Sequence, residues 1–160
     1  MRAFLNLFIV FVLFFGCKPQ NKISGDYAHE TECLGVELDG SQTLKTYGLG
    51  RNRLDAVEQA KKNAVRDVLV NGIRKGNGGC SERPILFEVN VIEKHEDYFN
   101  VFFRDGGLYK EFISLKDERF IEQLFPQKIQ GTNQVMYGIT VRVLRSELKK
   151  QMVKDKILNQ

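Results

Sequence analysis

Two short runs that mix apolar with polar residues, 33–38 (CLGVEL) and 42–49 (QTLKTYGL), flank the dipeptide Asp39-Gly40. Asp-Gly between two such runs is the strongest short signal for a tight hairpin turn. The pattern therefore predicts a β-hairpin. Its second strand reaches Gly48 and Gly50, and a helical pattern begins almost at once.

That helical pattern extends from Asn52, a favourable N-cap residue, to about Asn71, with Gly72 as its stop. Apolar and charged residues fall on opposite faces, and the alanines of the apolar face would let the helix lie close on a sheet. The inward face comprises Val57, Ala60, Ala64, Val65, Val68 and Leu69, and the outward face comprises Glu58, Lys61, Lys62 and Arg66.

The middle of the chain is aromatic and less regular. Pro84 opens the run PILFEVNVIE, whose alternation predicts a strand with Ile85, Phe87, Val89 and Val91 turned inward. The segment HEDYFNVFFRDGG predicts a short helix that ends at two glycines, and 109–125 predicts a short strand (109–115) and then a helical turn (117–125). The aromatic face of the short helix consists of Tyr98, Phe99, Phe102 and Phe103.

The last third of the chain predicts a hairpin that turns near 131–133, followed by a helix capped by Ser146. One face of the second strand carries Val135, Tyr137, Ile139, Val141 and Val143, and the apolar side of the helix carries Leu148, Met152, Val153 and Ile157. The patterns together predict an α+β fold, in which an antiparallel sheet is packed by one long helix, with a short aromatic helix and a C-terminal helix.

The chain begins with a different pattern. Arg2 precedes an apolar run, 3–15, and Gly16 then precedes Cys17. This order is typical of a secretory signal, and the run is shorter than the roughly 20 residues that cross a bilayer. Gly16-Cys17 resembles the lipobox of bacterial lipoproteins, which implies cleavage before Cys17 and lipidation of that cysteine. An ordinary signal peptide or an uncleaved anchor is the alternative.

We therefore expect a lipoprotein signal peptide over 1–16, a lipidated cysteine and polar tether over 17–30, and a single domain over 31–160. No acidic residue stands directly after Cys17, which favours a lipoprotein of the outer membrane that faces the periplasm. The formal net charge of +4 becomes +3 when Arg2 is removed. A net charge of this size is ordinary for a soluble domain, and the expected location is the cell envelope. Nucleic acid is therefore not an expected partner.

With Cys17 taken by lipid, the remaining cysteines are Cys33 and Cys80. Paired cysteines in an oxidising compartment usually form a disulfide, and we predict one here. The alternatives are free thiols or a metal site that uses His29 and Cys33, although a second half of such a site is missing from the sequence.

The glycines before the long helix raise the question of a nucleotide site. A dinucleotide-binding fingerprint needs a third small residue where this chain has Arg53, and a buried parallel strand rather than one arm of a hairpin. We therefore expect no nucleotide.

The same stretch, with Gly48 and Gly50 followed by Ala56, Ala60 and Ala64, resembles the small domain of the flagellar assembly protein T family and a related family of bacterial outer-membrane lipoproteins. The ending, 137–158, fits the same families. The resemblance covers 33–73 and 134–158, and it implies an α+β domain that assists envelope assembly and has no known catalytic site. In that reading the glycines let the strand end come under the helix N-terminus.

Residues for catalysis are few. His29 and His95 are the only side chains with an ordinary pKa near neutrality, and their neighbourhoods favour surface or capping roles. We expect no enzyme activity, no metal and no cofactor. The basic run Arg142, Arg145, Lys149, Lys150, Lys154 and Lys156 reads as the polar face of the last helix, with contact to anionic head groups or peptidoglycan as the alternative.

The function we expect is that of a membrane-anchored, non-catalytic factor that binds a protein partner in the envelope or assists assembly. The alternative is an envelope enzyme or small-ligand carrier without a recognisable motif. The candidate binding surface is an accessible edge of the aromatic cluster, Tyr98 with Tyr109, because tyrosine can bury its ring while its hydroxyl stays wet. The alternative is that these aromatics only fill the core.

Overall fold

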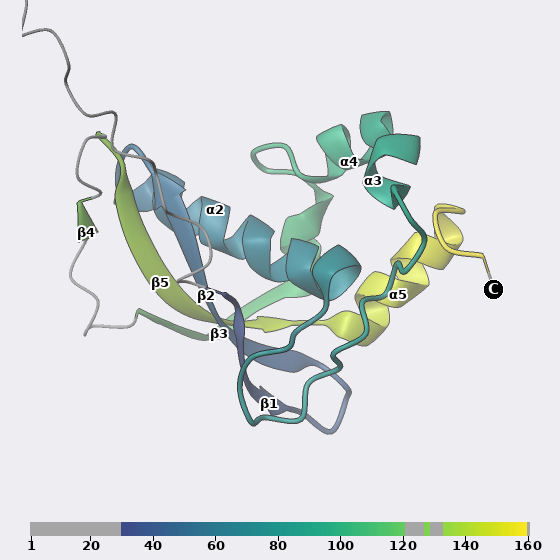
Figure 1. Ribbon diagram of the computed structural model, residues 1–160, viewed down its shortest axis with the longest axis horizontal. Coiled ribbons are helices and arrows are strands. Elements are labelled where there is room, and N and C mark those ends of the chain that lie inside the picture. Colours follow the sequence, from purple (N-terminus) through teal and green to yellow (C-terminus); the bar gives the residue numbers. More distant parts are fainter. Residues whose placement is uncertain (1–29, 121–126, 129–132, 160) are drawn as a thin grey trace, which may run out of the picture.

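The computed structural model describes residues 30–120, 127–128 and 133–159. The predicted α+β fold is confirmed: an antiparallel sheet is covered on one face by a long helix, and the shorter helices lie toward one end of the molecule (Figure 1). The predicted signal peptide, Cys17, His29 and nearly all of the tether lie outside the described residues. Within the part of the chain that the structure describes, no helix is both long and apolar enough to cross a membrane.

The first hairpin forms as predicted from strands β1 (Glu32–Val36) and β2 (Gln42–Gly50). At its turn the N–H of Gly40 donates to the carbonyl of Glu37 at 2.9 Å, and Gly40 has a φ of +79°. The Asp39 carboxylate accepts from both the N–H and the hydroxyl of Ser41. The Asp-Gly pair therefore supplies the backbone conformation and the side-chain acceptor that the turn needs.

Strand β5 (Val135–Val143) lies between β2 and β3, so the sheet order is β1-β2-β5-β3, and the two-residue β4 (Gln127–Lys128) also pairs with β5. The register places Thr46 opposite Ile139 and Leu44 opposite Val141, all of them buried. The expected inward face of β5 is therefore confirmed for Ile139, Val141 and Val143, whereas Val135 and Tyr137 are only partly buried. The turn that we predicted near 131–133 lies mostly outside the described residues.

Helix α2 (Arg53–Arg66) continues into a π-helical turn, η3 (Asp67–Asn71). The predicted cap is confirmed, because the Asn52 side chain accepts from the N–H of Asp55 at 3.0 Å. The predicted stop is confirmed as well, since Gly72 has a φ of +77°, which L side chains rarely adopt. The inward face contributes Ala56, Val57, Ala60, Ala64, Val65, Val68 and Leu69 to the buried core.

The glycines at the end of β2 allow this helix to lie close to the sheet. A Cβ on Gly48 would come within 2.1 Å of the carbonyl oxygen of Ala56, and one on Gly50 within 2.3 Å of the amide nitrogen of the same residue. These distances are far below van der Waals contact. Gly48 and Gly50 are therefore packing residues that bring the strand end under the helix N-terminus.

The strand that we predicted over 84–93 is wrong. Ile85 and Leu86, which are neighbours in sequence, are both buried, whereas Phe87 and Val89 are exposed. The amides of Ile85 and Leu86 donate to carbonyls at the end of the long helix, Val68 O at 3.1 Å and Leu69 O at 2.7 Å. Because helix-terminal carbonyls need donors from outside the helix, this segment satisfies them instead of joining the sheet.

The aromatic helix is confirmed as α4 (Glu96–Phe102), preceded by the single turn α3 (Val91–Lys94). The following residues differ from prediction: 109–112 belong to a 3-10 turn, η4 (Leu108–Phe112), and β3 (Ile113–Phe120) begins only afterwards. Pairing of β3 with β5, which starts at Ile113 opposite Val143, makes 117–120 part of a strand, so a helical turn there is wrong. The remainder, 121–125, lies outside the described residues.

The C-terminal helix is confirmed as α5 (Arg145–Lys154), with Leu148 and Met152 fully buried and Ile157 buried just beyond its end. The predicted cap is wrong, because the N-cap residue is Leu144 and no side chain caps the helix. The Ser146 hydroxyl instead donates to the carbonyl of Asp39 at 3.3 Å, and so connects α5 to the turn between β1 and β2.

Candidate functional site

The predicted binding pair, Tyr98 with Tyr109, is not an exposed patch. Tyr109 is 0% exposed, so the expectation that it stays accessible is wrong: its ring lies beneath Lys62, with the lysine nitrogen 5.8 Å from the ring centroid. Tyr98 is half-buried, and its hydroxyl donates to the Asp155 carboxylate at 2.6 Å. A contact of Tyr98 with a partner stays a prediction.

The structure instead forms an open groove beside the buried Tyr109, with a volume of about 610 Å³. Its floor and walls come from the end of β2, the outer face of α2, the loop between α4 and η4, and the residue before β5. The lining residues are Leu49, Gly50, Arg51, Leu54, Asp55, Glu58, Gln59, Lys62, Asp105, Lys110 and Gln134.

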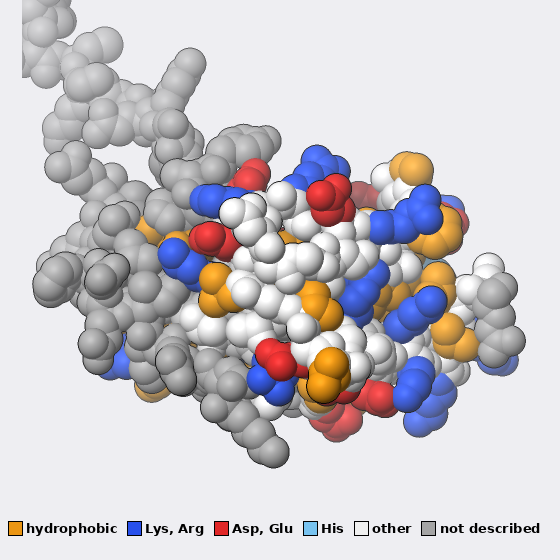
Figure 2. Space-filling view, turned by 90° about the horizontal axis from the view of Figure 1, so that it is seen from below, with side chains coloured by type: hydrophobic (Ala, Val, Ile, Leu, Met, Phe, Trp, Pro, Cys, Tyr) orange, Lys and Arg blue, Asp and Glu red, His pale blue; other side chains and the backbone are white. Residues whose placement is uncertain are grey.

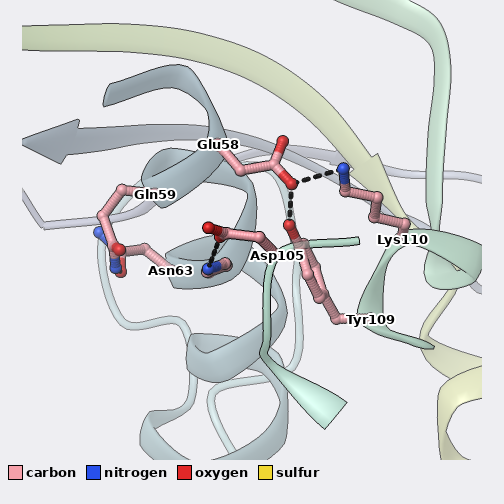
Figure 3. Close-up of polar contacts among 7 residues, drawn as sticks. Glu58, Gln59, Asn63, Asp105, Tyr109 and Lys110 are labelled. Carbon is pink, nitrogen blue, oxygen red and sulfur yellow. Dashed lines mark hydrogen bonds and ion pairs between the residues drawn. The ribbon is translucent and has the colours of Figure 1, made fainter. Parts of the chain in front are cut away.

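Two ion pairs connect the opposite walls of this groove (Figure 3). Glu58 on α2 pairs with Lys110 on η4 at 2.7 Å, and Lys62 on α2 pairs with Asp105 at 2.7 Å. The Tyr109 hydroxyl donates to the same carboxylate oxygen of Glu58. The outer face of α2 is therefore joined to the α4–η4 segment by three polar side-chain contacts.

A third pair, Arg51 with Asp55 at 2.9 Å, lies at the N-terminal end of the helix. Nearby, Gln59 donates to Asn63 at 2.8 Å, and Asn63 donates in turn to the carbonyl of Tyr47 on β2. The groove thus carries cations and carboxylates in alternation. Leu54 adds an apolar contact, since it is 80% exposed at the rim.

These contacts fix the charges of the groove. Burial raises the pKa of the Glu58 carboxyl, but hydrogen bonds from Lys110 and Tyr109 outweigh it and leave that pKa below its ordinary value. A hydrogen bond from Lys62 lowers the pKa of Asp105. Burial, together with the bond to Glu58, raises the pKa of Tyr109. At neutral pH the groove therefore presents the ionised carboxylates of Glu58 and Asp105, and the buried Tyr109 beside it keeps its proton.

A second polar cluster lies, partly buried, at the junction of α2 and η3. Thr31 donates to one oxygen of the Asp67 carboxylate, and Asn71 donates to the other at 2.6 Å. The Thr31 hydroxyl also lies 3.2 Å from that of Thr46 on β2. This cluster fastens the first described residues to the core, which is a structural task.

The predicted disulfide between Cys33 and Cys80 is confirmed, with 5.8 Å between the two Cα atoms. Its sulfurs are bonded to each other, so Cys33 is not available to the metal site that we considered with His29. The loop that carries Cys80 lies against β1: a Cβ on Gly76 would come within 2.3 Å of the carbonyl oxygen of Cys33, and one on Gly78 within 2.4 Å of the amide nitrogen of Gly35. Glycines at those two positions allow the loop to pack there.

Among the described residues, no group of three or more His, Cys, Asp or Glu side chains is arranged to hold a metal ion. His95 is partly buried between α3 and α4 as the N-cap residue of α4, and its side chain makes no capping hydrogen bond. Cys17, the predicted lipidation site, and His29 lie outside the described residues.

Sequence reasoning missed the groove. Asp105 and Lys62 are 43 positions apart, and Tyr109 and Glu58 are 51 apart. The helical period does place Glu58 and Lys62 on the solvent face of α2, so half of each pair was visible in the sequence. The other half was not, because it depends on how the α4–η4 segment folds back over that face.

Comparisons with protein families, with curated proteins and with solved structures found nothing that matches this chain.

Proposed function

We propose that this chain is a lipid-anchored protein of the bacterial cell envelope, attached to the outer membrane through Cys17 and facing the periplasm. The observation that carries the proposal is the Cys33–Cys80 disulfide. Disulfides persist in oxidising compartments and are rare where thiols are kept reduced. The bridge supports an extracytoplasmic address independently of the signal pattern in 1–17.

The function that we propose for the domain is non-catalytic: it binds a protein partner or assists the assembly of an envelope structure. The groove on the outer face of α2 is the proposed binding surface. Its charges are already paired within the domain, so a partner with side chains of both signs can exchange contacts with them without leaving a buried charge unpaired. Leu54, exposed at the rim of the groove, adds an apolar side chain to this otherwise charged surface.

One observation favours the alternative of a small-ligand carrier or envelope enzyme, namely that the groove volume of about 610 Å³ falls in the range of small-molecule sites. Such sites are usually enclosed and mostly apolar. This groove is open and lined mainly by charged side chains, which suits a protein surface better.

The anchor is tested by Cys17→Ser. Because that cysteine is the proposed site of acylation, the variant should lose labelling with palmitate and leave the membrane fraction. A variant that still labels would show that the lipobox interpretation is wrong.

The groove is tested by a photo-crosslinking residue in place of Leu54, used in intact envelopes. We expect a protein adduct from this position and none from Leu38, which is fully exposed in the turn before β2, away from the groove. The double variant Arg51→Asp, Asp55→Arg reverses an exposed ion pair of the groove and leaves the Tyr109–Glu58 hydrogen bond in place, so it should abolish the adduct without unfolding the domain. If the reversed variant still forms the adduct, the charges of the groove are not needed to bind the partner.

A further inference from the structure

Phe87 and Val89 are two large apolar side chains that face solvent. They are 71% and 78% exposed, while the residues directly before them, Ile85 and Leu86, are buried and bonded to the end of the long helix. Single exposed apolar side chains are common on proteins. Whether Phe87 and Val89 mark a binding surface therefore depends on the charges beside them.

The segment that carries Phe87 adjoins the start of α5. The guanidinium of Arg83 lies over the Phe87 ring, 5.6 Å from its centroid. The carbonyl of Arg83 accepts a hydrogen bond from Arg145, the first residue of α5, at 2.9 Å. An exposed aromatic ring, an exposed arginine and the first residue of the basic helix are thus neighbours.

Helix α5 and the two residues after it carry five basic and two acidic side chains. Both acids in this stretch are engaged, Glu147 by Lys150 at 2.7 Å and Asp155 by the Tyr98 hydroxyl and Gln151. Among the described residues, no ion-pair partner is found for three exposed lysines, Lys149, Lys154 and Lys156.

Figure 2 shows basic side chains gathered at the end of the molecule where α5 lies, with hydrophobic ones between them. Acidic residues are present on the adjoining segments. Glu88, between the two exposed apolar residues, is paired with Lys94. Glu82, Glu93, Glu96 and Asp97 are exposed, so the positive surface follows α5 rather than encircling Phe87.

We propose that this end of the domain docks on an anionic phospholipid bilayer, with Phe87 and Val89 in the interfacial region and the α5 lysines against the head groups. Exposed aromatic and aliphatic side chains next to a basic helix can bind the interfacial region of such a bilayer, with the apolar groups inserted and the lysines at the head groups. The inference rests on the proposed function, because the lipid on Cys17 is what keeps the domain at a bilayer.

Docking would also orient the molecule. Ile85 contacts the C-terminal end of the long helix, whereas Leu54 and the groove lie at its N-terminal end. With Phe87 and α5 on the membrane, the groove is turned toward the space in which a partner would approach.

The chain contains no tryptophan, so Phe87→Trp gives a unique fluorescent reporter. The lipidated full chain is reconstituted into vesicles of phosphatidylcholine alone, or of phosphatidylcholine and phosphatidylglycerol in equal parts, with brominated acyl chains as quenchers. We expect the indole emission of the Phe87→Trp variant to shift to shorter wavelength and to be quenched in the anionic vesicles only. Leu54→Trp, at a similarly exposed position near the other end of the long helix, is the matched control and should be unaffected. Equal quenching of both reporters, or of neither, would overturn the proposal.

Docking through the α5 lysines can be tested separately from anchoring by the lipid, if those lysines are replaced by glutamate in an unlipidated chain. In the unlipidated Cys17→Ser chain, Lys149→Glu with Lys154→Glu should weaken binding to anionic vesicles by roughly twentyfold or more, since each lysine near such a surface contributes about fivefold. Arg51→Glu with Arg104→Glu changes the same number of exposed charges elsewhere and should have little effect.

Two further outcomes are distinguishable. Failure of the anchor is read independently, as loss of flotation of the wild-type chain with neutral vesicles. If the emission of the Phe87→Trp variant shifted with purified peptidoglycan but not with vesicles, the membrane proposal would be overturned in favour of the cell wall.

Discussion

At the scale of single residues, two glycines decide how the helix meets the sheet. Gly48 and Gly50 face the first turns of α2, where a Cβ on either would fall within 2.3 Å of helix backbone atoms. Gly35 is also in a strand, yet a Cβ there would meet nothing within 4 Å. A side chain should therefore be tolerated at Gly35 in β1 but not at Gly48 or Gly50 in the neighbouring β2.

Gly48→Ala should destabilise the domain by roughly 1–3 kcal/mol or more, because the new methyl group forces α2 away from the sheet. Gly35→Ala is the control and should change the free energy of unfolding by less than about 0.5 kcal/mol. Urea unfolding midpoints measure both. Equal effects would mean that α2 is not as close to β2 in solution as described.

Asp67, whose carboxylate is partly buried, is the next residue with a testable consequence. Burial raises the pKa of Asp67 above its ordinary value of 3.8, although hydrogen bonds from Thr31 and Asn71 and the charge of Arg66 act in the opposite direction. Glu30 raises it further. The folded state therefore holds the Asp67 proton more tightly than the unfolded chain does.

Because the folded state binds more protons at this site, Asp67 should make the domain more stable as pH falls from neutral toward 3.8. The measurement is the difference in unfolding free energy between the wild type and Asp67→Asn. The variant keeps the contacts, because an amide can accept from Asn71 and donate to the Thr31 hydroxyl. Carboxylates whose pKa is lowered, such as Glu58, show the opposite trend but cancel in the difference. The wild type should gain stability relative to Asp67→Asn as the pH is lowered. If it does not, the pKa of Asp67 is not raised in the folded state.

At the scale of elements, those predicted correctly are those that local chemistry specifies. Asp39-Gly40 fixes its turn, and Asn52 with Gly72 marks the ends of the long helix. The segment 84–93 has the period of a strand, but distant carbonyls at the end of the helix use its amides. The groove depends on pairs such as Tyr109 with Glu58, which are 51 positions apart and carry no local signal.

The aromatic helix α4 contains both a core residue and a partly exposed residue, and their substitutions can be compared. Phe102 is buried and stacks on Phe112, with 6.0 Å between ring centroids, so Phe102→Ala should cost roughly 3–5 kcal/mol. Tyr98→Phe removes only the hydroxyl that donates to Asp155 and should cost about 1 kcal/mol. Thermal unfolding compares them. If Tyr98→Phe proved as damaging as Phe102→Ala, the link between α4 and α5 would be a main source of stability.

At the scale of the whole molecule, the long helix carries the groove, and the disulfide attaches the following segment to the sheet. The helix lies across the sheet and carries the groove toward its N-terminal end (Figure 1). The bridge fastens the long segment after the helix, the one that also carries Phe87, to β1 at the sheet edge. Without that bridge, the glycine-rich part of the segment would depend on backbone contacts such as that of Cys33 N–H with Lys75 O at 2.8 Å.

Replacing both cysteines by alanine should therefore lower the free energy of unfolding by about 4 kcal/mol, the value expected for closing a loop of this length. Reduction of the wild type should lower it by a similar amount, since both changes release the same loop in the unfolded chain. Thiol titration of denatured, unreduced Cys17→Ser protein should find no reactive thiol, and reduction should expose two. If reduction left the urea midpoint unchanged, the close packing of Gly76 and Gly78 on β1 would be enough to hold the segment, and the bridge would add little. Two thiols reactive before reduction would show instead that the bridge is absent in solution, and the proposed oxidising compartment would lose its main support.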